Sequence, residues 1–186
     1  IYALEGSIFI TGASIQWLRD KLKIIKYARE TEKITKKLKN NGGIYFIPAF
    51  TGLGAPYWDS DARGIITGLT RDTGRGEIIR AALESSVYQS IDLLNTIRDD
   101  LFKPNLIKID GGMTQNNWFN QFLADVSSLK VLKPKTQETT ALGAALIAAL
   151  GAGIFKSLSQ IAKKNRISKQ FTPKMSKKIR LKLLNG

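Results

Sequence analysis

The chain has 186 residues, of which 43% are hydrophobic and 24% charged, proportions typical of a globular domain with a real core. It contains no cysteine and no histidine, which excludes disulfides, thiol nucleophiles, imidazole bases and metal sites built from either residue. The net charge is +14, and the excess lies in two lysine-rich stretches, 19–39 and 163–182. These stretches either form solvated helices or bind nucleic acid or membrane; few aromatic residues are interleaved with the lysines, which favours solvated helices.

An apolar strand followed by a short helix is predicted at the start of the chain. Residues 2–11 are strand-like and close on Gly12, and Ser14 is a suitable N-cap for the helix that follows. The residues that recur at helical spacing, and are expected on the buried face of that helix, are Ile15, Leu18 and Leu22.

A charged helix and two short strands are predicted next. The helix runs over 27–40, and a pair of glycines ends it. The strands cover 44–48 and 64–69. The loop between them, 50–61, combines glycines, a proline and aromatic residues, which indicates a rigid loop of defined shape.

The rest of the chain alternates helices and strands, which predicts an α/β fold. The longest helix is expected over 77–101, with strands over 106–109 and 130–133 and a helix over 118–129 between those strands. The residues expected to face inward are Ile79, Leu83, Val87, Ile91 and Leu94 on the first helix and Phe119, Phe122 and Val126 on the second.

The stretch 140–150 (TALGAALIAAL) is predicted to be a helix of small residues. It is apolar on nearly every face, so we expect it to be buried. The longest apolar run, 141–155, contains three glycines and is shorter than the roughly 20 residues of a membrane span, so no span is predicted. The absence of cysteine is compatible with a cytoplasmic protein.

Two strand-to-helix junctions carry glycines followed by a polar side chain four residues later. Gly12 precedes Gln16 in one junction, and Gly112 precedes Asn116 in the other. Each junction by itself is explained by a tight turn with a polar helix cap, or by a backbone that must come close to a ligand. As a pair they could flank one nucleotide, because helix N-termini offer free N–H groups to polar or anionic ligands.

The common nucleotide-binding loops are absent from the sequence. It has neither the G-x-x-x-x-G-K-[ST] pattern nor G-x-G-x-x-G. Asp59 and Asp61 lack further oxygen ligands at regular spacing, so no metal site is predicted in their loop.

Five segments make the chain closely similar to the C-terminal lobe of the FGGY carbohydrate kinases. They are YALEGSIFITGASIQWLRD, PAFTGLGAPYWDSDARG, GLTRDTGRGEIIRAALESSVYQS, DGGMTQNN and TTALGAALIAAL. The similarity covers nearly the whole chain, to about residue 175, and the 50–59 loop resembles the glycerol kinases of this family rather than its pentulose kinases.

The resemblance implies one lobe of a two-lobed, actin-like ATPase with a ribonuclease-H-like core, residues 1–186 forming a single nucleotide-binding lobe. It implies ATP binding through Gly12, Gln16, Gly112 and Asn116, and a connecting helix between the lobes at 140–150, where Gly143 would permit close packing. The activity implied is ATP-dependent phosphorylation of glycerol to glycerol 3-phosphate, with another polyol or sugar as the alternative acceptor and a basic nucleic-acid-binding module as the alternative outside the family.

The same resemblance places the catalytic aspartate, the glycerol site and most Mg²⁺ and phosphate contacts in the N-terminal lobe. No catalytic residue and no metal ligand is therefore expected in this chain. We expect the chain to be a lobe that is incomplete at both ends and inactive alone, and the complete enzyme to be a cytoplasmic homo-oligomer that uses ATP and Mg²⁺.

Overall fold

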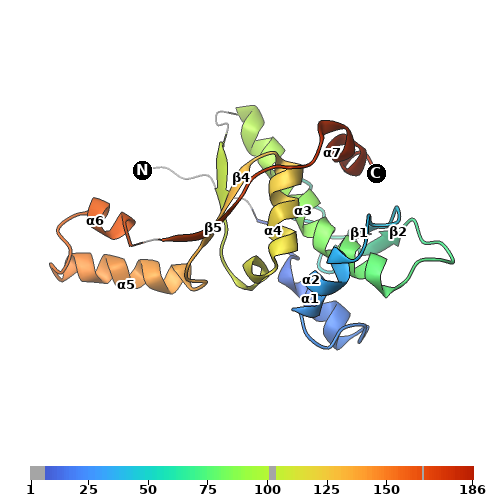
Figure 1. The fold of residues 1–186 in the computed structure, drawn as a ribbon, viewed down its shortest axis with the longest axis horizontal. Coiled ribbons are helices and arrows are strands. Elements are labelled where there is room, and N and C mark those ends of the chain that lie inside the picture. The colour runs from blue at the N-terminus through green and yellow to red at the C-terminus, as the bar shows by residue number, and fades with distance from the viewer. Residues whose placement is uncertain (1–6, 101–103, 165) are drawn as a thin grey trace.

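The long helix α3 (Arg75–Asp100) runs through the centre of the molecule, and four other elements pack against it (Figure 1). The computed structural model describes residues 7–100, 104–164 and 166–186. Helices α1 (Gly12–Asp20), α2 (Glu30–Lys36) and α4 (Asn117–Ser127) all contact α3. The predicted stripe on α3 is confirmed, since Ile79, Leu83, Val87 and Ile91 are buried and Leu94 packs against the same core.

Two small sheets complete the core, and they confirm the predicted α/β class. Strands β1 (Tyr45–Ile47) and β2 (Ile65–Thr67) form an antiparallel pair. Strands β3 (Leu106–Lys108), β4 (Lys130–Pro134) and β5 (Ile167–Phe171) form a second sheet in that order, with β3 parallel to β4 and β5 antiparallel to it.

Helix α4 is the crossover between the parallel strands β3 and β4, which explains its apolar face. Phe119, Phe122 and Val126 are buried as their spacing predicts, and α4 packs on β4 and β5. On the facing side of the sheet, Val131 and Phe171 lie directly opposite each other and are both buried. The short 3-10 helix η1 (Gly112–Gln115) joins β3 to the start of α4.

The predicted start of the chain is partly wrong. Of the expected strand 2–11, residues 2–6 lie outside the described residues and 7–11 form no strand. Helix α1 begins at Gly12 with Thr11 in the N-cap position, so Ser14 lies inside the helix. Its hydroxyl donates to the Thr11 carbonyl oxygen at 2.7 Å, because a serine side chain within a helix can reach the carbonyl one turn back.

Helix boundaries also differ from the predictions in this region. Ile15 and Leu18 are buried as expected, but Leu22 is 41% exposed because α1 ends at Asp20. The charged helix expected over 27–40 forms only over Glu30–Lys36. The pair of glycines then follows in the left-handed region, with φ of 65° at Gly42 and 80° at Gly43, which only glycine adopts without strain.

The 50–61 loop is ordered by its own side chains and backbone. Leu53 and Asp59 form an isolated antiparallel bridge, and the Ala55–Pro56 peptide bond is cis. The Asp59 carboxylate accepts hydrogen bonds from the backbone N–H groups of Asp61 and Ala62 at 2.9 and 3.0 Å. These bonds show that Asp59 stabilises a turn, in agreement with the rigid loop that the composition of 50–61 predicts.

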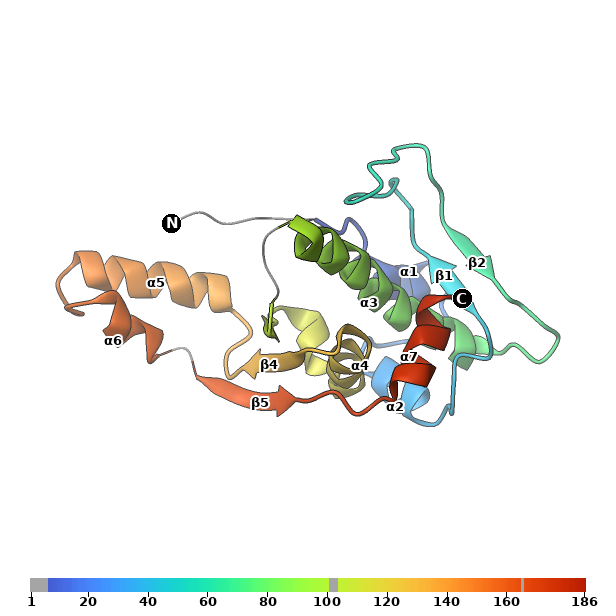
Figure 2. The same cartoon turned by 90° about the horizontal axis from the view of Figure 1, so that it is seen from above.

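Helix α5 (Thr139–Gly151) contradicts the expectation of burial. It has no buried residue, and Ile147 is 57% exposed. In Figures 1 and 2, α5 and the short α6 (Leu158–Ala162) form an arm that projects away from the body, and α6 is the helix that packs against α5. The prediction of burial is therefore wrong, because within the described residues α6 is the element that packs against α5, and it leaves most of the helix surface uncovered.

The C-terminal helix α7 (Lys177–Leu184) lies at the other end of the molecule, near β1 (Figure 2). The Tyr45 hydroxyl donates to the Leu183 carbonyl oxygen at 3.2 Å, which ties the two elements together. Within the described ranges, no helix combines the length and hydropathy that crossing a membrane requires.

Candidate functional site

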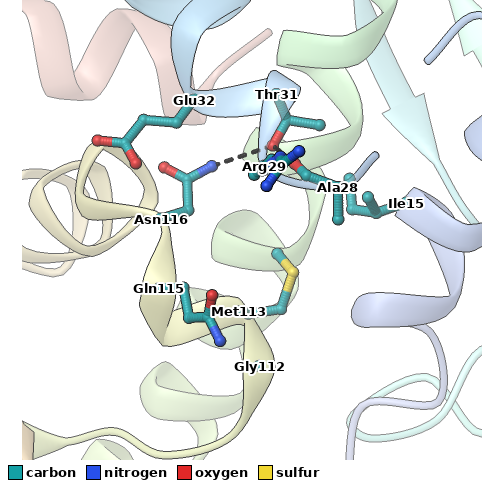
Figure 3. A pocket seen from close by; sticks show the side chains of 9 residues that line it. All are labelled: Ile15, Ala28, Arg29, Thr31, Glu32, Gly112, Met113, Gln115 and Asn116. Carbon is teal, nitrogen blue, oxygen red and sulfur yellow. Dashed lines mark hydrogen bonds between the residues drawn. The ribbon is translucent and has the colours of Figure 1, made fainter. Parts of the chain in front are cut away.

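A hollow of about 150 Å³ opens between η1, the start of α4, helix α2 and helix α1 (Figure 3). It brings together residues that are far apart in the chain. Its lining consists of Ile15, Ala28, Arg29, Thr31, Glu32, Gly112, Met113, Gln115 and Asn116.

The lining of this hollow combines apolar and polar side chains. Ile15 projects from α1 on one side, and Met113 projects from η1 on the other side, below Ala28 (Figure 3). Arg29 and Glu32 contribute a guanidinium and a carboxylate from the α2 side. An apolar slot with a few polar groups at its edge suits a flat ring that carries hydrogen-bonding atoms.

Gly111 and Gly112 are adjacent at this site, and a different physical reason explains the glycine at each position. Gly111 has φ of 81°, a left-handed conformation that favours glycine. Gly112 lies outside that region, and a Cβ placed on it would meet no atom within 4 Å. Among the described residues neither strain nor crowding calls for glycine at 112, so the open space beside its backbone is available to a ligand.

Asn116 holds the wall of the hollow together. Its side-chain oxygen accepts a hydrogen bond from Phe119 N at 3.0 Å, which caps α4. Its Nδ2 donates to Thr31 Oγ1 at 3.3 Å, and this bond is drawn in Figure 3. The helix-cap alternative is therefore realised, and the amide keeps one further N–H for which the described residues supply no acceptor.

Glu32 is a charged group at the rim of the hollow. Burial raises its pKa, but the hydrogen bond and charge of Lys36, with hydrogen bonds from Asn117, outweigh burial, so its pKa lies below the ordinary value. Lys36 Nζ lies 2.5 Å from Glu32 Oε1. Glu32 is therefore ionised at neutral pH, and it joins α2 to the first residue of α4.

The structure brings Gly112 and Asn116 to the hollow but leaves Gly12 and Gln16 outside its lining. Both lie on α1, the helix that contributes Ile15. A Cβ on Gly12 would also meet nothing within 4 Å, and the Gln16 side chain is exposed. Their contact with a nucleotide stays a prediction, and the expected strand before Gly12 does not form in residues 7–11.

Sequence reasoning missed most of the opposite wall. Ala28, Arg29, Thr31 and Glu32 stand in a charged stretch with no local sign of a site, and about 85 residues separate Thr31 from its partner, the side chain of Asn116. Met113 also gave no signal, although it directly follows Gly112, which the sequence singles out.

The sequence is similar to that of known carbohydrate kinases. The profile of the FGGY family of carbohydrate kinases, C-terminal domain, matches residues 1–152. The chain is 51% identical over 185 residues to the glycerol kinase of Rhodospirillum centenum and 50% identical over 186 residues to that of Alcanivorax borkumensis. Each alignment covers 100% of this chain but only 37% of the relative, so the chain spans little more than a third of those proteins.

Solved structures agree with the sequence comparison. The structure of Plasmodium falciparum glycerol kinase with ADP superposes with a TM-score of 0.90 at 39% identity, over 99% of this chain and 37% of that chain. A xylulose kinase from Lactobacillus acidophilus, at 23% identity, superposes with a TM-score of 0.81 over 97% of this chain and 36% of its own, and shows the shared fold. The fold is therefore that of the actin-like ATPase class, in the form found in sugar kinases. The chain belongs to the FGGY family of carbohydrate kinases, and its match is to the family's C-terminal domain.

Proposed function

We propose that this chain supplies the adenine-nucleotide side of a glycerol kinase, which transfers the γ-phosphate of ATP to a hydroxyl of glycerol. The observation that carries the proposal is Gly112, whose open surroundings lie at the edge of an apolar hollow. The relatives at about 50% identity are glycerol kinases, and the matching Plasmodium falciparum structure contains ADP. We propose residues 1–186 as one nucleotide-binding lobe.

The chain's own residues would bind and orient the nucleotide. The base would lie in the slot between Ile15 and Met113, and the missing side chain at Gly112 would let the ribose or ring approach the backbone. Asn116 would offer its remaining N–H, while its cap bond and its bond to Thr31 hold it in place. Gly12 and Gln16 lie about one turn apart on α1, the helix that also carries Ile15, and both would lie along the same ligand.

The remaining parts of the proposal rest on family membership. ATP would need Mg²⁺ to offset phosphate charge during transfer, and no metal ligand in this chain is proposed. The glycerol-binding site, and the aspartate that takes the hydroxyl proton, would lie outside the matched segment. We also propose a cytoplasmic enzyme that forms a homo-oligomer.

Nucleotide binding by the chain is the direct test. Calorimetric titration with ADP is expected to show weak binding that Gly112→Val abolishes, because the valine side chain would occupy the ligand's space. Gly143→Val is the matched control, since a Cβ on Gly143 of α5 also meets nothing within 4 Å and lies outside the hollow. Equal ADP affinity in the two variants would remove Gly112 from the site.

Catalytic function requires a longer protein, which a chimera provides. This chain would replace the matching 37% of the Rhodospirillum centenum glycerol kinase, and formation of glycerol 3-phosphate from ATP would be measured. Gly112→Val in the chimera is expected to raise KM for ATP by about tenfold or more, with KM for glycerol unchanged. A chimera whose KM for ATP is unchanged by Gly112→Val would contradict the nucleotide role proposed for this chain.

A further inference from the structure

A group of cationic side chains gathers where β4 and β5 lead into the α5–α6 arm. Lys133 and Lys169 are direct partners on these antiparallel strands, so their side chains share one face of the sheet. Two residues further along, beyond the Pro134–Ile167 pair, Lys135 N donates to the Arg166 carbonyl oxygen at 2.8 Å, which brings a second pair of basic residues side by side. Like charges directly opposite each other destabilise a sheet unless something compensates them.

A bulge next to these pairs is held by a serine. The register shifts between Lys133 and Pro134, and the Ser168 hydroxyl donates toward the carbonyl oxygens of both residues, at 3.2 and 2.9 Å. A β-bulge bends its strand and changes the direction of the side chains that follow it. It leads the chain into the loop that contains Lys135 and Thr136.

A hollow of about 360 Å³ lies between the two basic strand ends and the arm. It is lined by Lys135, Thr136, Leu142, Lys164 and Arg166. Three of these five side chains are cations, one carries a hydroxyl and one gives an apolar wall. Lys164 is oriented by the Phe155 ring, whose centroid lies 5.6 Å from its Nζ.

In the part of the chain that the structure describes, none of these cations forms an ion pair with an acidic side chain. The ion pairs among the described residues lie elsewhere, on α1, α2 and α3. The sequence contains no aspartate or glutamate after Glu138, which itself is not part of the lining. A concave site with one sign of charge concentrates counter-ions, so an anion would relieve the repulsion that the fold has assembled.

We infer that this hollow binds a small multivalent phosphate anion. The Arg166 guanidinium offers a planar pair of donors for phosphate oxygens, Lys135 and Lys164 offer ammonium groups, and Thr136 offers a hydroxyl. The site shares no lining residue with the hollow at Gly112, so it is separate from the proposed nucleotide site.

The two sites are nevertheless connected through one loop. Gln137 accepts a hydrogen bond from Gln115 at 2.9 Å, and Thr139 donates to the Asp110 carboxylate. Both residues lie in the segment that directly follows Lys135. The proposed anion site therefore lies next to the residues that hold η1 in place. Anion binding itself does not depend on the proposed kinase activity.

Pyrophosphate is the probe for this site. Calorimetric titration of the chain at physiological salt is expected to show saturable binding, which the double variant Lys135→Gln/Arg166→Gln weakens by more than about tenfold. Lys177→Gln/Lys178→Gln on α7 is the matched control, because it removes the same charge from exposed residues outside the hollow, and it should change affinity by less than about threefold. Lys135→Arg should retain binding.

Three results would overturn the inference. They are the absence of saturable pyrophosphate binding in the wild type, equal losses in the two double variants, and loss of binding in Gly112→Val, which would assign the anion to the nucleotide hollow. Single-stranded DNA serves as a further probe. If it binds far more tightly than pyrophosphate and both double variants weaken it equally, the charge acts as a diffuse polyanion surface and not as a phosphate site.

Discussion

The Glu84 carboxylate accepts a hydrogen bond from Arg80 Nε at 2.7 Å, and both side chains are buried. Arg80 also donates to the Leu38 carbonyl oxygen at 2.8 Å, and its guanidinium lies 5.2 Å from the centre of the Trp118 ring. One arginine of α3 therefore holds the end of α2 and the start of α4 together. These are the two helices that carry the Thr31–Asn116 wall of the nucleotide hollow.

The second oxygen of Glu84 completes the network. It accepts hydrogen bonds from the Tyr88 hydroxyl and from Asn41 Nδ2, both at 3.0 Å. Asn41 also donates to the Ile44 carbonyl oxygen at 3.0 Å, which fixes the turn before β1. A buried ion pair of this kind adds stability only because further hydrogen bonds satisfy its remaining groups.

Glu84→Gln is expected to lower the free energy of unfolding by about 3 kcal/mol, because an amide has one acceptor oxygen where the carboxyl group has two, so buried donors around it lose their partner. Denaturant titration followed by circular dichroism would measure the change. Glu77→Gln in the first turn of the same helix is a suitable control, since Glu77 caps the exposed Gly74 N–H and should cost far less. Equal losses in the two variants would mean that the Arg80 contact contributes little.

The pH dependence of stability should also report on Glu84. Burial raises its pKa above 4.5, and the hydrogen bonds and charge of Arg80, with bonds from Tyr88 and Asn41, oppose burial only in part. The folded chain then binds this proton more tightly than the unfolded chain. The group's contribution is complete below the unfolded value and is lost as pH rises through the raised folded value. The stability advantage of the wild type over Glu84→Gln should therefore shrink from about pH 4 upward; an advantage that grows over this range would show the opposite shift.

Two substitutions at Asn116 would separate its cap role from its ligand role. Asn116→Ala removes the bond to Phe119 N and should cost about 1 kcal/mol of stability. Asn116→Asp keeps the cap oxygen but loses the Nδ2 donor, so stability should be nearly retained while ADP affinity falls. Chemical denaturation and ADP titration on both variants provide the comparison. Full ADP affinity in Asn116→Asp would limit this residue to capping.

The exposed arm should make the isolated chain self-associate. Helix α5 carries no charge and no buried residue, and Ile147, Ile154 and Leu158 on the arm are 57%, 71% and 60% exposed. A contiguous apolar surface of this kind promotes association, and the +14 charge opposes it only within about 8 Å at physiological salt. Sedimentation velocity is expected to show dimers or larger species that Ile147→Lys disperses. Ile179→Lys, on the 54% exposed Ile179 of α7, is the control. A monodisperse wild-type monomer would refute this reading of α5.

The sequence by itself determined those elements in which the spacing of apolar residues identifies the buried face. The stripe on α3, the inward phenylalanines of α4 and the strand–helix–strand order of β3, α4 and β4 follow from local patterns, because the face that a residue occupies depends on its position along the element. The parallel pairing of β3 with β4 comes from the structure. The choice of Gly112 and Asn116 was possible for a similar reason, since a glycine pair before a polar helix start is a local signal.

Only the tertiary structure decided what faces those elements. Thr31 and Glu32 of α2 complete the hollow, together with Ala28 just before that helix, and the sequence of this charged stretch carries no sign of it. The sequence of α5 predicts a core helix, yet the helix is exposed. The Ser14 hydroxyl donates to the Thr11 carbonyl oxygen from within α1 and does not cap the helix. The pairing of Lys135 with Arg166 likewise appears only when β4 and β5 meet. In each case the deciding contact joins segments that periodicity describes separately, because local spacing specifies which face of an element is apolar but not which partner covers it.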